Sequence, residues 1–176
     1  MGEVYISVDI EASGPVPPTY SMLSIGACIV GAPERSFYAE LCPISEGSVP
    51  AALDVVGRPL DYFQRNGREP YDAMLEFEQW IREVSGDGEA VFVGFNAPFD
   101  WAFVNWYFVT FLGENPFGIG GVDIKSYYMG MANVSWADTR SSRLPPTLKG
   151  SEPETHDALD DARRQAALFA RMRSAQ

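Results

Sequence analysis

The spacing of hydrophobic and polar positions predicts a sheet in the first part of the chain. Three segments are rich in β-branched residues or alternate between apolar and polar side chains, which is typical of strands. We expect them to form an antiparallel meander with its second turn near 31–34, over residues 4–11, 20–30 and 35–42. Gly26 inside the second strand indicates a bulge or a close backbone approach.

A mixed strand and helix pattern follows. Turn-forming residues over 43–70 predict a surface connection with one short helix near 60–65, and a one-sided apolar stripe predicts a helix over 71–84. The apolar run at 90–95 lacks alternation, as expected of a strand buried on both faces. Because a helix between two strands implies a right-handed parallel crossover, this strand should lie parallel to the first.

The last part of the chain predicts a fifth strand, further helices and a loop rich in Ser and Pro. The strand is expected at 120–124, the helices at 97–112, 125–131 and 156–172, and the loop at 133–154. The part of the first helix at 101–112 is apolar on nearly every side, which favours burial or a homodimer interface. The order of elements predicts an α/β fold, with a mixed sheet of five strands flanked by helices.

Two acids end the first strand. Asp9 and Glu11 alternate with an isoleucine, so both project from the same face, with Cα atoms about 6.5–7 Å apart. The crossover brings them near Asp100, in the first turn of a helix that Asn96 is expected to cap. The last helix offers Asp161, with His156 before its first turn. These residues are therefore expected to converge at the carboxyl edge of the sheet.

Composition narrows the classes of function. A chain of 176 residues with 46% hydrophobic positions predicts one folded domain, residues 1–176. The net charge of −11 argues against tight non-specific binding to long duplex nucleic acid but leaves short or single-stranded substrates open. No apolar run is long enough for a membrane span, and we expect a cytoplasmic protein with no membrane partner. Cys28 and Cys42 are predicted to be reduced thiols, since the hairpin register holds them too far apart to bridge.

Carboxylates crowded into one pocket repel one another, and a divalent metal relieves that repulsion. Ligands that are all oxygen favour Mg²⁺ or Mn²⁺ over zinc. Two ions about 3.5–4 Å apart would clamp a phosphodiester between the attacking water and the leaving oxygen. His156, the only histidine, is the natural general base for that water.

Three motifs resemble those of the DEDDh 3′→5′ exonuclease family, which includes ribonuclease T, oligoribonuclease and proofreading exonucleases. They are VDIEASGP at 8–15, GFNAPFD at 94–100 and HDALDDA at 156–162. The resemblance implies a ribonuclease H-like fold and two-metal hydrolysis from a 3′ end, releasing nucleoside 5′-monophosphates. Position by position, it implies that the general base is His156 and that the metal-binding acids are Asp9, Glu11, Asp100 and Asp161.

The same resemblance implies three substrate contacts, at Ala12, Leu23 and Phe99, although core packing explains Leu23 and Phe99 equally well. A basic group in the loop, formed by Arg140, Arg143 and Lys149, is a candidate for holding phosphates, with a solvated loop as the alternative.

Three functions fit these observations. Single-stranded RNA or short oligoribonucleotides are the favoured substrates, because the acidic surface suits short strands. A proofreading-type or repair exodeoxyribonuclease is the first alternative, since the motifs do not read the 2′-hydroxyl. The second is a catalytically idle scaffold that binds nucleic-acid ends or a protein partner, which is disfavoured because all five motif positions are filled.

Overall fold

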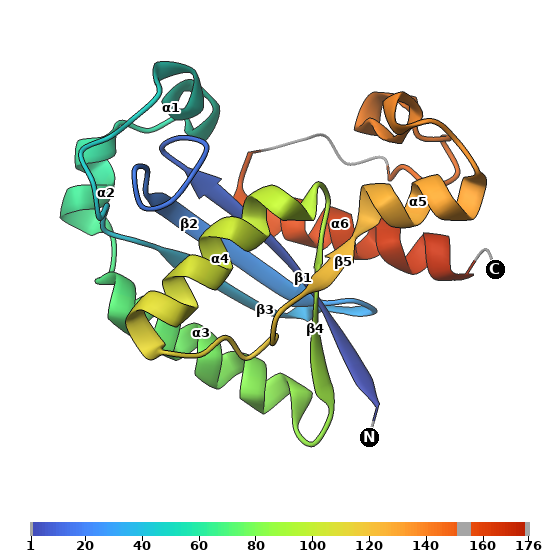
Figure 1. The fold of residues 1–176 in the computed structure, drawn as a ribbon, viewed down its shortest axis with the longest axis horizontal. Helices are drawn as coiled ribbons and strands as arrows, with labels where there is room; N and C mark the ends of the chain where they lie inside the picture. The colour runs from blue at the N-terminus through green and yellow to red at the C-terminus, as the bar shows by residue number, and fades with distance from the viewer. Residues whose placement is uncertain (1, 151–155, 175–176) are drawn as a thin grey trace.

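In the computed structural model, described here for residues 2–150 and 156–174, the described residues form one five-stranded sheet between helices (Figure 1). The strand order is β3-β2-β1-β4-β5. The first three strands are antiparallel, whereas β4 and β5 run parallel to β1. The bounds are β1 Glu3–Ala12, β2 Met22–Ile29, β3 Ala32–Glu40, β4 Glu89–Gly94 and β5 Gly121–Asp123. The predicted mixed sheet and its parallel crossover are confirmed.

Helices cover both faces of the sheet (Figure 1). One face packs against α3 (Pro70–Ser85) and α4 (Ala97–Leu112), and the other packs against α6 (Ala158–Ser174) and α5 (Ile124–Ala132). The remaining short elements are α1 Pro50–Val56, α2 Leu60–Asn66, and the 3₁₀ turns η1 Trp136–Thr139 and η2 Ser141–Arg143. Among the described residues, no helix is both long enough and apolar enough to cross a bilayer.

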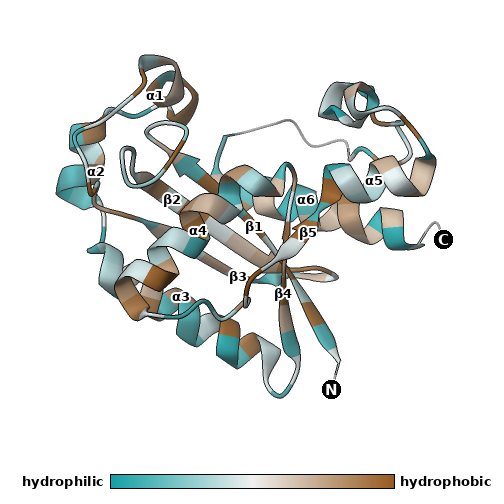
Figure 2. Cartoon of the chain, viewed as in Figure 1, coloured by the Kyte–Doolittle hydropathy of each residue, from teal (hydrophilic) through white to brown (hydrophobic). Residues whose placement is uncertain are grey.

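Strand β1 divides its side chains between the two faces. Ile6, Val8 and Ile10 are buried in the core shared with α3 and α4. Tyr5 instead packs on Phe169 of α6, with ring centroids 5.6 Å apart. Alternation therefore places the acids at 9 and 11 on the α6 face of β1, at its carboxyl end. Figure 2 colours this end of the strand as hydrophilic.

Gly26 allows α6 to begin directly on the sheet. It lies opposite Asp9 in the β1–β2 register, and a Cβ atom there would come within 2.3 Å of the backbone of Ala158 and Leu159. Real Cβ atoms do not approach backbone so closely, so only glycine fits. The close backbone approach that the sequence predicts is confirmed, and it brings the first turn of α6 over the acids of β1.

Three local predictions were wrong in detail. Residues 43–70 contain two helices rather than one, because Pro50 starts α1 and the left-handed Gly57 ends it after seven residues, too few to show a periodic pattern. The turn between β2 and β3 is tighter than expected, since β3 already begins at Ala32. Asn96 does not cap α4 with its side chain, because it adopts a left-handed conformation with φ of 68°.

The apolar helix α4 is largely used inside the chain. Phe103, Val104, Tyr107 and Phe108 are buried in the core, and the Tyr107 hydroxyl accepts a hydrogen bond from the backbone of β2. Both cysteines are free, and Cys28 lies opposite Ser36, as the reduced-thiol prediction requires. The homodimer interface stays a prediction.

Candidate active site

Asp9 is held at the centre of the site. Its carboxylate oxygen Oδ1 accepts a hydrogen bond of 2.5 Å from Nε2 of Gln165 in α6. Burial raises the pKa of Asp9 well above its ordinary value, and the negative charges of Asp100, Glu11 and Asp161 raise it further. The hydrogen bond from Gln165 acts in the opposite direction. Asp9 therefore lies among the other three predicted acids.

Asp100 joins the site from the first turn of α4. It is 3% exposed, and its Oδ1 accepts a hydrogen bond of 3.1 Å from the backbone nitrogen of Ile10, between the two acids of β1. Burial raises its pKa to about 8, against the effect of its backbone hydrogen bonds. This bond fixes α4 against β1 and directs the carboxylate to the strand end, as the crossover predicts.

Glu11, Asp161 and His156 form a compact group. One potential ligand atom of each lies within 4.8 Å of the others, a spacing that suits a metal ion. Burial raises the pKa of Glu11 to about 7, with contributions from the charges of Asp161 and Asp157. Asp161 is 8% exposed and pairs with Arg164 at 2.8 Å. The acids of β1 and α6 thus meet, as the sequence indicates.

His156 is exposed and lies just before α6. Its φ of 53° is left-handed, a conformation in which histidine occurs more often than most residues. Asp157 caps the helix that follows, because its Oδ1 accepts hydrogen bonds from the backbone nitrogens of Leu159 and Asp160. The pre-helical position predicted for His156 is confirmed, and the imidazole lies beside the acids of two other elements.

The donor set fits divalent metal. Four carboxylates from three elements converge, and burial and mutual repulsion raise the pKa values of Asp9, Glu11 and Asp100. Such groups give up their protons readily when a cation supplies the missing positive charge. Oxygen donors match Mg²⁺ or Mn²⁺.

Gln165 is a site residue that sequence reasoning missed. It is 8% exposed and bridges two elements, because its Nε2 donates to Asp9 while its Oε1 accepts from the backbone nitrogen of Phe95 at 2.9 Å. Its spacing of four from Asp161 places both on one side of α6, which was the available signal. The bridge fixes the orientation of the Asp9 carboxylate.

Asp123 was also missed, and it has a structural role. It ends β5, and its Oδ1 accepts from the backbone nitrogen of Ala97 at 3.0 Å. Its Oδ2 accepts from the nitrogen of Ser126 at 2.9 Å. One carboxylate therefore caps both α4 and α5. On α4 it has the capping role that was expected of Asn96.

The three predicted substrate residues differ in exposure. Ala12 is 6% exposed at the end of β1, and Leu23 has no exposed surface. Phe99 is half-buried and packs edge-on against Phe103, with ring centroids 5.4 Å apart. The burial of Leu23 and the aromatic contact of Phe99 agree with the core-packing alternative, and the substrate contacts stay predictions.

The basic residues of the loop do not act as one group in this structure. Arg143 pairs with Asp138 at 2.8 Å, whereas Arg140 is exposed. Lys149 lines a pocket beside α6. Of these three residues, only Lys149 lines this pocket, and the pocket borders the candidate site.

A mixed sheet with this strand order, carrying four acids and a histidine at its carboxyl edge, defines a ribonuclease H-like nuclease. No family model matches the chain. The chain is 51% identical over 168 residues to the 3′-5′ DNA exonuclease Cap18 of Escherichia coli, covering 95% of this chain and 90% of that protein.

Solved structures confirm the fold. The nuclease domain of 3′hExo, a DEDDh family member bound to rAMP, matches with a TM-score of 0.76 and 14% identity, over 98% of this chain and 92% of that one. A 3′-exonuclease that recognises the histone mRNA stem-loop matches with a TM-score of 0.77 and 14% identity, over 96% of this chain. This chain spans 63% of the length of that second structure.

The chain belongs to the DEDDh family of 3′-5′ exonucleases, as its three motifs indicate.

Proposed function

We propose that the protein is a divalent-metal-dependent 3′-5′ exonuclease that removes nucleoside 5′-monophosphates from single-stranded ends. The observation that carries this proposal is the convergence of acids from β1, α4 and α6 with a histidine beside them. The residues proposed to hold metal are Asp9, Glu11, Asp100 and Asp161.

Bound divalent ions, two of Mg²⁺ or Mn²⁺, would supply the positive charge that activates a water and stabilises the leaving oxygen. The protein's part is to hold its carboxylates in place before they bind. The Ile10 nitrogen holds Asp100, and Gln165 holds Asp9. Because both acids are fixed by hydrogen bonds, little side-chain entropy remains to be lost when a cation arrives.

His156 is proposed as the general base. The water oxygen forms the new bond to phosphorus while His156 takes its proton, and the bond from phosphorus to the 3′ oxygen of the preceding nucleotide breaks. That oxygen leaves with a proton from solvent. The exposed position of His156 supports this role, since the imidazole reaches both the site and bulk water.

DNA becomes the first substrate to test. The charge of the chain supports a short substrate but does not separate RNA from DNA, whereas a relative at 51% identity is named a DNA exonuclease. The structural neighbours include proteins with RNA ligands, but at 14% identity they show only the fold. We therefore propose single-stranded DNA 3′ ends, with RNA as the second candidate.

Two further proposals concern organisation. Residues 1–176 are proposed to act as a single exonuclease domain, because one sheet and the helices packed on it carry all the site acids. The idle-scaffold alternative loses support, since the five predicted positions are filled and brought together. Cytoplasmic location stays a prediction.

Digestion of 5′-labelled single-stranded DNA and RNA of one sequence, with Mg²⁺ or Mn²⁺, tests the function. We expect a ladder that shortens by one nucleotide at a time, faster on DNA. A label at the 3′ end should be released as mononucleotide from the first turnover. If neither strand is shortened with either metal, the nuclease proposal fails.

A further inference from the structure

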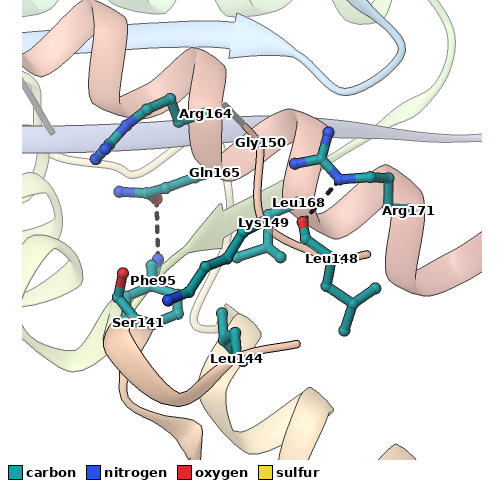
Figure 3. A pocket seen from close by; sticks show the side chains of 10 residues that line it. All are labelled: Phe95, Ser141, Leu144, Leu148, Lys149, Gly150, Arg164, Gln165, Leu168 and Arg171. Atoms are coloured by element: carbon teal, nitrogen blue, oxygen red, sulfur yellow. Dashed lines mark hydrogen bonds between the residues drawn. The ribbon is translucent and has the colours of Figure 1, made fainter. Parts of the chain in front are cut away.

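A pocket lies between the middle of α6 and the loop that follows α5 (Figure 3). Its volume of about 560 Å³ falls within the range of sites for small molecules. The described residues that line it are Phe95, Ser141, Leu144, Leu148, Lys149, Gly150, Arg164, Gln165, Leu168 and Arg171.

The charge of the pocket is opposite to that of the protein. Lys149, Arg164 and Arg171 line it, and its described lining includes no carboxylate, although the whole chain has a net charge of −11. Arg171 donates its Nε to the carbonyl oxygen of Leu148 at 2.8 Å, which attaches the loop to α6. A cationic pocket on an acidic protein selects an anion.

The remaining wall of the pocket is apolar. Phe95, Leu144, Leu148 and Leu168 belong to or pack against the core beneath α6. A phosphate alone gains nothing from these side chains, whereas a flat base gains contact with a ring and with leucines. The lining as a whole therefore fits a phosphate ester that carries a planar aromatic ring, as a nucleotide does.

The pocket and the acids are separated by single side chains. Gln165 lines the pocket and donates to Asp9 at 2.5 Å, and Arg164 lines the pocket and pairs with Asp161 at 2.8 Å. Figure 3 shows Gln165 and Arg164 on successive positions of α6 at one end of the pocket. A group bound in the pocket is therefore next to a phosphate bound at the acids.

We infer that the pocket holds the nucleotide directly upstream of the scissile bond, with its phosphate near Lys149 and its base against the apolar wall. This inference rests on the proposed exonuclease function. The same chemistry describes a released mononucleotide, so the test has to separate the two sources. Binding on the leaving side would let the enzyme hold the shortened strand after each cut.

Two substrates separate the pocket from the chemistry. A thymidine trinucleotide has a nucleotide upstream of the bond that breaks, whereas the 4-nitrophenyl ester of thymidine 5′-monophosphate has only nitrophenol there. Lys149→Met removes one cation from the pocket. We expect it to lower kcat/KM for the trinucleotide about tenfold, the loss of one charge-assisted contact, and to leave hydrolysis of the ester unchanged.

The matched control is Arg173→Met. Arg173 lies on α6 and stacks on Tyr5 at 4.3 Å, and it does not line the pocket. Its substitution removes the same charge and should leave both rates near those of the wild type. Lys149→Arg should restore the rate on the trinucleotide.

Each other result has a definite meaning. If the natural protein cleaves both substrates and Lys149→Met changes neither, the pocket inference is wrong. An equal loss on both substrates would make Lys149 structural and overturn it too. If the variant only relieves inhibition by added thymidine 5′-monophosphate, the pocket holds free product rather than the strand. If the natural protein cleaves neither substrate, the proposed function has failed and the inference fails with it.

Discussion

The acids of β1 and α4 and the histidine before α6 are held by different means. Asp9 is half-buried and Asp100 is buried, and each accepts a hydrogen bond that joins it to another element. His156 is exposed, at the start of a helix and in a left-handed conformation. The two acids proposed to hold metal are thus fixed against the sheet, whereas the group proposed to move a proton lies where it meets solvent. Charge has to be preorganised, but a proton has to leave.

Substituting Asp9 should produce the largest effect. Asp9→Asn keeps an oxygen for Gln165 but removes a negative charge from the metal site, and we expect the rate of DNA shortening to fall by about a thousandfold or more. The metal-free variant should melt no lower than the natural protein, because one source of repulsion among buried acids is gone. Thermal denaturation of the two proteins is the control. An Asp9→Asn protein with near-natural activity would remove Asp9 from the metal site.

His156 should show a smaller loss that separates chemistry from metal binding. For His156→Ala we expect a rate reduced by about a hundredfold to a thousandfold, as for loss of a general base. Added imidazole should restore part of that rate, and Mn²⁺ affinity measured by calorimetry should stay within a few-fold. A variant that loses metal affinity instead would make His156 a ligand, as its grouping with Glu11 and Asp161 also allows.

Gln165 tests whether the buried region depends on orientation. Gln165→Leu keeps the size but removes the donor to Asp9 and the acceptor for Phe95. We expect metal affinity and kcat/KM to fall about tenfold to a hundredfold, with saturating metal recovering part of the rate. Gln165→Glu retains the acceptor but adds a negative charge beside Asp9. Without metal, this variant should therefore be less stable than Gln165→Leu. Equal metal affinity in all three proteins would sink the positioning role.

The smallest effect concerns metal-free stability. The pKa of Glu11 is raised to about 7 and that of Asp100 to about 8, both above their unfolded values. The folded protein therefore binds more protons than the unfolded chain in this range. As pH rises through 7 and 8 these protons are lost, and the free energy of unfolding falls. We expect the Tm of EDTA-treated protein to fall between pH 6 and about 8.5 and Mg²⁺ to offset that fall. A metal-free Tm that climbs over the same range would contradict the raised pKa values.

The acids could be predicted because their placement follows from local geometry. Alternation in β1 sets Asp9 and Glu11 on one face, and the crossover rule brings Asp100 to the same edge. His156 and Asp161 were predicted from the spacing of the motif at 156–162, at the start of a helix. These predictions needed only periodicity and connectivity, which are properties of neighbouring residues.

Other features depend on elements far apart in the chain. Gln165 reads as an ordinary helix residue until α6 is seated over Gly26, 139 positions earlier in the numbering, and only then does it reach Asp9. Asp123 caps two helices for the same reason.

The sequence by itself determined the order of strands and helices, the four acids and the histidine, because periodicity and motif spacing are written locally. Tertiary structure alone decided that Leu23 is buried and that Lys149 and Arg171 line a cationic pocket next to the acids. Those outcomes depend on which surfaces meet after folding, and a side chain's partners across the sheet leave no periodic signal along the chain.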